Sequence, residues 1–265
     1  MAQSNEIQFT MDGRPVHARP GETVLSVAGR YGINIPALCH HEAVAPYGVC
    51  RLCLVEVFWG SRSKLVTSCV YVAEENDVVE TNNERVRRAR SIILELLLAR
   101  CPEAEVIREL AAEYGVTETR FRARAGAALS QRCILCGLCV RVCDEVIGQS
   151  AIGYESRGFQ RVVATPFHGE AQECIGCGAC VFVCPTGALH YEDIDGRRIM
   201  KELNTEIPLV KCRVCGEFFA TEKQIVKLRE RLNLPDEIAQ TCPNCRGTEF
   251  RTVVEKALVR QRRGW

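Results

Sequence analysis

The sequence predicts an α+β protein made of several small modules, each organised around cysteines. Cysteine occurs 17 times in 265 residues, which is far above ordinary usage. Short extended runs and stretches of helical periodicity alternate along the first part of the chain. Two cysteine-rich segments, CILCGLCVRVC and ECIGCGACVFVC, are near copies about forty residues apart, as a duplicated half-domain would leave them.

The N-terminal part predicts a hairpin, a short helix and two further strands. The Asp12-Gly13 pair is a strong turn signal between two extended runs within residues 7–19. A short helix is expected over residues 22–31, with Gly32 at its C-terminal cap. The two further strands are expected over residues 53–59 and 65–70.

Two helices are expected next, followed by a basic linker. Thr81-x-x-Glu84 has the form of a capping box, and apolar residues recur after it at helical spacing. Pro102 suits the first turn of a second helix over residues 103–114. The linker covers residues 117–128, and a later helical stretch is expected from Thr221 to Leu232.

Two cysteine runs have the ligand spacing of cubane iron–sulfur sites. They are Cys133, Cys136, Cys139 and Cys143, and Cys174, Cys177, Cys180 and Cys184. In two-cluster ferredoxins the fourth cysteine of each run binds the other cluster, so Cys184 is assigned to the first [4Fe–4S] cluster and Cys143 to the second. The alternative is a pair of zinc sites, which this spacing suits less well.

Four earlier cysteines form a separate set: Cys39, Cys50, Cys53 and Cys69. Their spacing is not that of plant-type ferredoxins, but the order hairpin, helix, ligand loop, strand and distal cysteine is that of a β-grasp ferredoxin. The set predicts a [2Fe–2S] centre, with structural thiols or zinc as the alternatives. His40 and His41 are interpreted as loop residues, and tuning of the cluster is their alternative role.

Four C-terminal cysteines predict a zinc site with four thiolates: Cys212, Cys215, Cys242 and Cys245. The 26 residues between the two pairs exceed the usual ribbon spacing, and an inserted helix would account for them. An iron–sulfur cluster and free thiols are the alternatives. Cys101 is left over and is expected to be a buried thiol that packs as a small hydrophobe.

Composition and local pattern exclude several other classes of protein. The net charge of +1 gives no nucleic-acid or membrane footprint. The N-terminus lacks the pattern of a signal peptide and the longest apolar run, residues 92–99, is too short to span a bilayer, so a cytoplasmic location is expected. No nucleophile, acid–base pair or phosphate-binding glycine motif is present, so we expect no catalytic residues and no NAD or flavin site on this chain.

These observations predict five segments along the chain. They are a β-grasp [2Fe–2S] domain over residues 1–80, a helical linker over 81–128, a two-cluster ferredoxin domain over 129–200, a zinc-ribbon-like module over 205–250 and a basic tail over 251–265. The expected cofactors are one [2Fe–2S] cluster, two [4Fe–4S] clusters and one zinc ion, or a further iron–sulfur cluster in place of the zinc.

Four motifs carry a family resemblance: PALCHHE, GVCRLCLVEV, CILCGLCVRVCDEV and ECIGCGACVFVCPTGAL. Over residues 5–195 the chain resembles the small iron–sulfur subunit of NAD-reducing hydrogenases and the N-terminal part of the large iron–sulfur subunit of respiratory NADH dehydrogenase. Related modules occur in iron-only hydrogenases and NAD-linked formate dehydrogenases. The family's usual cluster with one histidine and three cysteine ligands is not expected here, because the corresponding stretch holds only Cys101 and no histidine.

The resemblance implies an electron-transfer subunit rather than a complete enzyme. Its partners would be an NADH- and flavin-binding subunit and a second redox or catalytic subunit, with ferredoxin as a further partner, in a hetero-oligomer without nucleic acid or a membrane span. The complex would be of the hydrogenase, formate dehydrogenase or electron-bifurcating reductase type. A structural iron–sulfur and zinc adaptor and a standalone low-potential carrier are the rival hypotheses.

Overall fold

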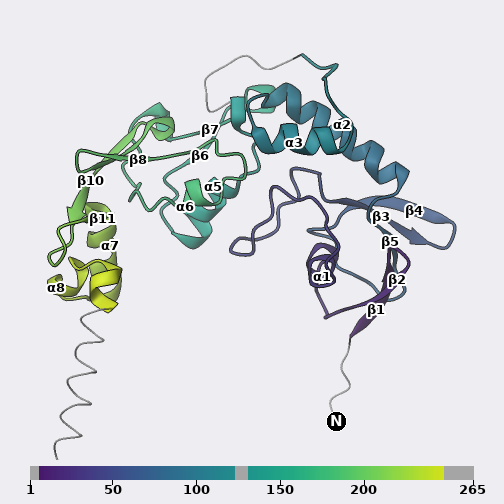
Figure 1. Ribbon diagram of the computed structural model, residues 1–265, viewed down its shortest axis with the longest axis horizontal. Helices are drawn as coiled ribbons and strands as arrows, with labels where there is room; N and C mark the ends of the chain where they lie inside the picture. Colours follow the sequence, from purple (N-terminus) through teal and green to yellow (C-terminus); the bar gives the residue numbers. More distant parts are fainter. Residues whose placement is uncertain (1–5, 123–130, 248–265) are drawn as a thin grey trace, which may run out of the picture. The chain divides into compact units, whose positions relative to one another are not determined.

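The structure is a computed structural model that describes residues 6–122 and 131–247 (Figure 1). The basic tail predicted over residues 251–265 and the last part of the predicted linker lie outside the described residues. The chain divides into two compact units, which are described separately. The first comprises residues 1–147, 154–163 and 180–189, and the second comprises residues 148–153, 164–179 and 190–265.

The first unit begins with a five-stranded mixed sheet of order β2-β1-β5-β3-β4. Its strands are β1 (Ile7–Met11), β2 (Arg14–Ala18), β3 (Leu54–Trp59), β4 (Arg62–Thr67) and β5 (Val78–Glu80). β1 and β5 are parallel, and the other neighbouring pairs are antiparallel. The hairpin prediction is confirmed, because Asp12 and Gly13 join β1 to β2 with positive φ angles of 49° and 74°. The strand predicted over residues 65–70 instead begins at Arg62 and ends at Thr67.

Helix α1 (Val24–Arg30) covers this sheet. It begins at Val24, two residues later than predicted, because Thr23 is its N-cap and accepts a hydrogen bond from the Ser26 amide. Gly32 follows its end with a φ of 70°. The buried apolar side chains of the helix and the sheet form one core: Phe9, Met11, Val16, Val24, Val27, Val55, Val57 and Val79. This core holds the ends of the loop that carries the first cysteines.

Helix α2 (Glu84–Arg100) does not begin with the predicted capping box. Its N-cap is Asn83, whose side chain accepts a hydrogen bond from the Val86 amide at 2.9 Å. Thr81 instead donates its backbone N–H and its hydroxyl to the Asp12 carboxylate, at 2.7 and 2.6 Å. The hairpin turn therefore binds the threonine that the sequence pattern assigned to the helix.

A buried arginine attaches α2 to the sheet. Arg90 is 1% exposed, and it donates to the Leu54 carbonyl at 2.6 Å and to the Tyr114 hydroxyl at 2.8 Å. Tyr114 is the C-cap of α3 (Glu105–Glu113). The second helix thus begins later than predicted and Pro102 lies before it, because a turn from Cys101 to Ala104 separates the two helices.

The remaining part of the first unit carries the first cysteine run and its surroundings. Its elements are α5 (Leu138–Arg141), a π-helical turn (Val142–Val146), β6 (Gly153–Glu155), β7 (Val162–Ala164) and α6 (Ala179–Phe182). β6 and β7 form a two-stranded sheet. A short 3₁₀ turn lies at Gly158–Gln160, and another at Pro166–His168 belongs to the second unit.

The second unit contains an antiparallel four-stranded sheet of order β11-β10-β9-β8. The strands are β8 (Glu192–Ile194), β9 (Arg197–Met200), β10 (Thr205–Lys211) and β11 (Phe218–Thr221), with a 3₁₀ turn at Lys201–Leu203. Helices α7 (Glu222–Leu232) and α8 (Asp236–Ala239) follow. The helix prediction for residues 221–232 is confirmed, and Thr221 and Gln224 form a capping box that the sequence analysis missed.

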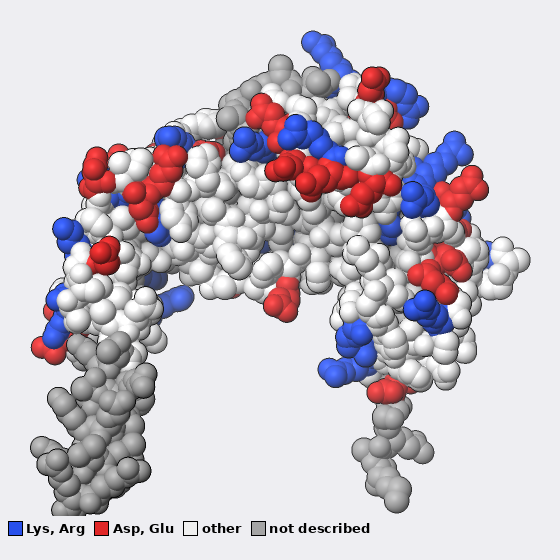
Figure 2. Space-filling view, viewed as in Figure 1, with Lys and Arg blue, Asp and Glu red and all other residues white. Residues whose placement is uncertain are grey.

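Two further features of the described residues are the distribution of charged side chains and the length of the apolar helices. Figure 2 shows both acidic and basic side chains over the region of α2 and α3. Among residues 6–122 and 131–247, no helix is long and apolar enough to cross a membrane.

Candidate metal centres

The first four-cysteine set comes together beside the N-terminal sheet. Cys39, Cys50, Cys53 and Cys69 are all buried, with at most 6% exposure. The sulfur atoms of Cys53 and Cys69 are 3.4 Å apart, and the Cys50 amide donates to the Cys39 sulfur at 3.4 Å. The folded chain therefore gathers thiols from a long loop and from the end of β4 into one buried group.

The electrostatics of this set favour thiolates at two positions. Hydrogen bonds from the Cys50 and Cys69 thiols hold the pKa of Cys39 far below its usual value. A hydrogen bond from the Cys69 thiol lowers the pKa of Cys53 to about 6. The same hydrogen bonds raise the pKa of Cys50 and of Cys69. Because metal ligands must be deprotonated, an iron–sulfur centre in this donor set would displace these two protons.

The local backbone explains how the ligand loop fits against the sheet. Gly48 has a φ of 66°, and a Cβ atom there would stand 3.4 Å from Val70 and 3.9 Å from the Cys69 sulfur. Arg51 also has a positive φ, of 61°, and its guanidinium donates to the Thr67 hydroxyl at 3.2 Å. Both residues turn the chain tightly around the cysteines.

The two histidines after Cys39 lie on the same loop. The Ala43 amide donates to Nδ1 of His41 at 3.1 Å, so this ring stabilises a turn of the loop. Nδ1 of His40 is buried and has no hydrogen-bond partner among the described residues.

The first cubane set lines a cavity within the first unit. Its lining includes Cys133, Cys136, Cys139 and Cys184, together with the apolar residues Ile134, Val163, Ala188 and Leu189. The Leu135 amide donates to the Cys133 sulfur at 3.4 Å, and the Ala188 amide donates to the Cys184 sulfur at 3.2 Å. A largely apolar cavity with four cysteines and amide donors to sulfur is what a [4Fe–4S] cluster requires.

The cysteines predicted for the second cubane are divided between the units. Cys143 and Cys180 belong to the first unit, whereas Cys174 and Cys177 belong to the second. In the second unit the Gly176 amide donates to the Cys174 sulfur at 3.4 Å.

The sheet of the second unit supports the loop between Cys174 and Cys177. Arg198 on β9 donates to the Gly176 carbonyl at 2.7 Å, and the Thr221 hydroxyl donates to the Ile175 carbonyl. A Cβ atom on Gly176, whose φ is 66°, would stand only 2.8 Å from Thr221 Cγ2. These supporting contacts were not predicted from the sequence, because they come from strands that its pattern did not indicate.

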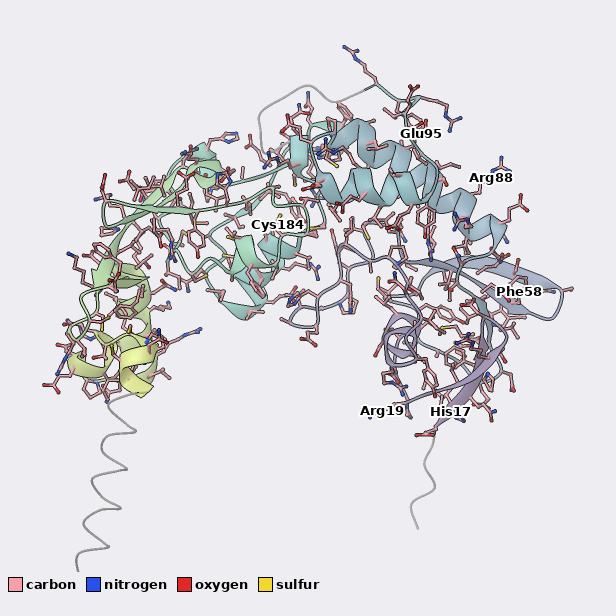
Figure 3. All side chains as sticks on the ribbon, viewed as in Figure 1. His17, Arg19, Phe58, Arg88, Glu95 and Cys184 are labelled. Carbon is pink, nitrogen blue, oxygen red and sulfur yellow. The ribbon has the colours of Figure 1, made fainter. Side chains whose placement is uncertain are left out.

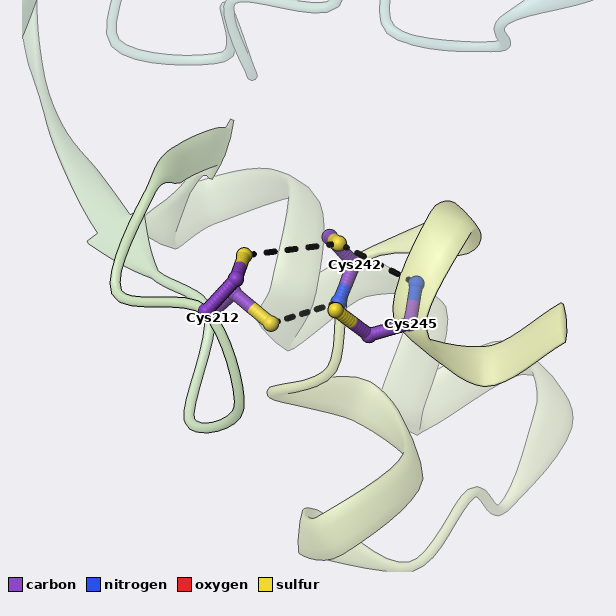
Figure 4. Close-up of side chains that lie close together, drawn as sticks. Cys212, Cys242 and Cys245 are labelled. Atoms are coloured by element: carbon purple, nitrogen blue, oxygen red, sulfur yellow. Dashed lines mark hydrogen bonds between the residues drawn. The ribbon is translucent and has the colours of Figure 1, made fainter. Parts of the chain in front are cut away.

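The four C-terminal cysteines form a compact sulfur cluster (Figure 4). The sulfur atoms of Cys212, Cys215, Cys242 and Cys245 all lie within 4.8 Å of one another. Sulfurs about 2.3 Å from a tetrahedral zinc ion are roughly 3.8 Å apart, so the group needs little change to hold one. The amides of Cys242 and Val214 donate to the Cys212 sulfur, at 3.3 and 3.4 Å. The Cys242 amide is the main cause of a pKa of about 6 for Cys212.

Cys101 differs from the other cysteines. It is fully buried, and its thiol donates to the Leu97 carbonyl at 3.0 Å. Burial, with a smaller contribution from Cys133, raises its pKa to about 12. Its environment therefore favours a neutral thiol.

Arg141, which lies between Cys139 and Cys143, is a further residue of this region that was not predicted from the sequence. Its guanidinium donates to the Cys39 carbonyl at 3.2 Å and lies 5.2 Å from the ring centre of Tyr47. A charged residue inside the otherwise apolar run CVRVC is the signal that could have singled it out.

Comparisons with known proteins identify two domains. Residues 4–84 match the family of 2Fe-2S iron-sulfur cluster binding domains, and residues 132–188 match the 4Fe-4S dicluster domain family. The matches include the first four-cysteine set and both cysteine runs. The C-terminal four cysteines lie outside them.

Longer relatives extend this likeness. The chain is 37% identical over 206 residues to a subunit of the NADH-quinone oxidoreductase of Rhizobium meliloti (strain 1021), covering 69% of this chain and 24% of that protein. It is 31% identical over 182 residues to the mitochondrial NADH-ubiquinone oxidoreductase 78 kDa subunit of Candida albicans, covering 60% of this chain and 25% of that one. The chain thus spans about a quarter of the length of these curated relatives.

A solved structure is similar over most of its own length. A chain from the crystal structure of NAD+-reducing [NiFe]-hydrogenase in the H2-reduced state aligns with a TM-score of 0.52 and 30% identity. The alignment covers 60% of this chain and 74% of that one.

Proposed function

Because the chain belongs to the family of iron–sulfur subunits that includes the matched subunit of NADH-quinone oxidoreductase and the matched chain of NAD+-reducing [NiFe]-hydrogenase, we propose that it relays single electrons in a flavin-dependent NAD(P)H-linked oxidoreductase complex. The observation that supports this proposal most strongly is the cavity that Cys184 shares with Cys133, Cys136 and Cys139.

In this proposal the twelve cysteines of the matched domains hold three clusters. Cys39, Cys50, Cys53 and Cys69 hold a [2Fe–2S] cluster in a β-grasp domain, over residues 1–80. The two [4Fe–4S] clusters belong to residues 129–200, the first on Cys133, Cys136, Cys139 and Cys184, and the second on Cys174, Cys177, Cys180 and Cys143. When bound, such clusters accept and release one electron at a time. The chain's own contribution is to bury the sulfurs and to direct backbone amides at them, which tunes their potential.

The C-terminal cysteines are proposed to hold one zinc ion with a structural role, in a zinc-ribbon-like module over residues 205–250. The close grouping of the four sulfurs and the amides that donate to Cys212 support this proposal. Zinc has no redox chemistry in proteins, so the relay would not pass through this site.

The proposed partners are an NADH- and flavin-binding subunit and a second redox or catalytic subunit, with ferredoxin as a further partner, in a cytoplasmic hetero-oligomer. The known relatives are named as parts of NADH oxidoreductases and of a hydrogenase. In this arrangement the flavoprotein exchanges electron pairs with NAD(P)H, and the present chain passes the electrons on singly.

Metal analysis of anaerobically purified protein is the first test. The proposal predicts about 10 iron atoms per chain, two from the binuclear centre and four from each cubane, and about one zinc. About 14 irons without zinc would instead assign an iron–sulfur cluster to the C-terminal cysteines.

Reduction by NADH tests the relay itself. In the complex purified with its flavoprotein, NADH should bleach the visible absorption of the clusters within the time of one catalytic turnover of the complex. Clusters that are reduced by dithionite but stay oxidised with NADH would contradict the relay and favour a structural adaptor. A chain that purifies alone as a monomer would favour a standalone carrier.

A further inference from the structure

The loop that begins at Cys39 is bound by the helical segment of residues 138–146, which carries Cys139 of the first cubane set and Cys143. Arg141 donates from Nη2 to the Cys39 carbonyl at 3.2 Å and from Nη1 to the Ala45 carbonyl. The Ala45 amide in turn donates to a Glu145 carboxylate oxygen at 3.0 Å. Both backbone groups of Ala45 are therefore held by side chains one helical turn apart.

Tyr47, an aromatic residue of the same loop, lies close to the loop that carries Cys136. The Arg141 guanidinium lies 5.2 Å from the ring centre of Tyr47, within the range of a cation–π interaction. A carbon of the same ring would be 3.8 Å from a Cβ atom on Gly137, the residue after Cys136. We call Arg141, Glu145 and Tyr47 the loop clamp.

The chemistry of arginine suits this position. A guanidinium is planar and presents several N–H donors in a fixed fork, so one side chain can bind two carbonyls and still stack on a ring. A lysine ammonium in its place is a point charge and cannot reproduce this geometry. Because Arg141 lies between Cys139 and Cys143, any displacement of the clamp would also displace cluster ligands.

The loop clamp is better suited to fixing the position of the Cys39 loop than to increasing the stability of the fold. Glu145 and Tyr47 are exposed and Arg141 is half-buried, and polar contacts at such places contribute little to the free energy of unfolding. Their number and direction, however, fix where the loop lies relative to the helix.

We propose that Arg141 is a positioning residue that, with Glu145 and Tyr47, fixes the separation between the binuclear cysteine set and the first cubane set. The proposal rests on the proposed function, because electron tunnelling falls steeply with distance and two centres exchange electrons only while they are held close. Its subject is the loop itself, so it can be tested without NADH or a partner.

Amide hydrogen exchange on the full cluster-loaded chain is the first readout. In Arg141→Met and in Glu145→Ala, exchange at the Ala45 amide and its neighbours should become at least about 10-fold faster, since hydrogen bonds to charged groups are lost. Arg141→Lys should give an intermediate increase. The control is Arg88→Met, which removes an exposed arginine on α2 (Figure 3) and should leave this exchange unchanged.

Magnetic coupling between the reduced clusters is the second readout, and a merely structural contact would not change it. In dithionite-reduced wild-type protein the binuclear signal should be broadened by the neighbouring cubane, and Arg141→Met should weaken this broadening at equal iron content. Unchanged exchange and unchanged coupling in Arg141→Met would overturn the proposal. If that variant fails to retain iron, Glu145→Ala decides by the same two measurements.

Because dithionite reduces the clusters directly, failure of the clamp and failure of the proposed function remain distinguishable. Clusters that couple normally but are not reduced by NADH would contradict the relay alone. Clusters that NADH reduces, with coupling unaffected by Arg141→Met, would contradict the clamp alone.

Discussion

The hydroxyl of Tyr154 occupies the space that a Cβ atom on Gly137 would need. Gly137 has a φ of 77°, in the left-handed region that favours glycine. Tyr154 cannot retreat easily, because the guanidinium of Arg161 stacks 3.7 Å from its ring centre. Since Gly137 lies between Cys136 and Cys139, this contact shapes a ligand loop.

A Gly137→Ala variant should therefore lose local stability and iron. Left-handed backbone costs about 1 kcal/mol for alanine and overpacking adds about 1–3 kcal/mol. Gly115→Ala is the matched control, since Gly115 has a φ of 72° with nothing within 4 Å of its Cβ position. Adding Tyr154→Phe should restore part of the iron content. Equal iron content in Gly137→Ala and Gly115→Ala would show that Tyr154 leaves room for a side chain.

Cys101 is predicted not to be a cluster ligand. Its thiol is fully buried and its pKa is raised to about 12, so it stays protonated at neutral pH. Cys101→Ala should keep the iron content of the wild type and lose about 1 kcal/mol of stability, because a small buried group and one hydrogen bond are removed. Iron analysis and thermal unfolding measure the two effects. A loss of about four irons per chain would instead make Cys101 a ligand.

Removal of the C-terminal metal should unfold its surroundings and spare the iron clusters. The described apolar core there is small, with Ala220, Ile225 and Ala239 as its buried members, so metal binding should supply much of the folding energy. A zinc chelator should speed amide exchange over residues 212–245 without bleaching the cluster absorption.

Acid should have the same effect as the chelator. Protons compete with the metal for thiolates, and the pKa of Cys212 is about 6, so release should become easier as the pH falls through this value. Cys215→Ser should raise the pH at which the metal is lost. Exchange over residues 212–245 that is insensitive to both treatments would show that this part folds without metal.

The elements that the sequence predicted well are those with a local cause. The hairpin follows from Asp12-Gly13, and helix α1 follows from its cap and its apolar face. The prediction of a capping box at Thr81 was wrong, because this threonine donates its hydrogen bonds to a residue distant in sequence, Asp12. Sequence spacing alone does not reveal such a competitor.

In the candidate sites, too, the features with a local cause were predicted and those that depend on distant residues were not. Short spacing revealed the cysteine groups, since two or three ligands of each site follow one another within a few residues on a tight loop. The supporting residues could not be predicted in this way. Arg141 contacts a loop about one hundred residues away, and Thr221 supports the Cys174 loop from a strand that lies well beyond it in the sequence.

The Glu22–Arg30 pair predicts a pH dependence for helix α1. Burial alone would raise the pKa of Glu22, but hydrogen bonds from Arg30, the Arg19 amide and Ser26 lower it from 4.5 to about 2. The ionised form of Glu22 is therefore more stable in the folded chain than in the unfolded chain, which stabilises the fold above pH 4.5. This stabilisation is lost as the pH falls from about 4.5 to about 2.

Glu22→Gln should therefore weaken α1 at neutral pH and have little effect near pH 2. We expect a loss on the order of 1–2 kcal/mol at pH 7, reduced by solvent screening from the full shift. Amide exchange in α1, compared between variant and wild type at each pH, measures it, and the exposed Glu118→Gln serves as the control. A difference that persists unchanged to pH 2 would mean that packing of the side chain, rather than its charge, stabilises the helix.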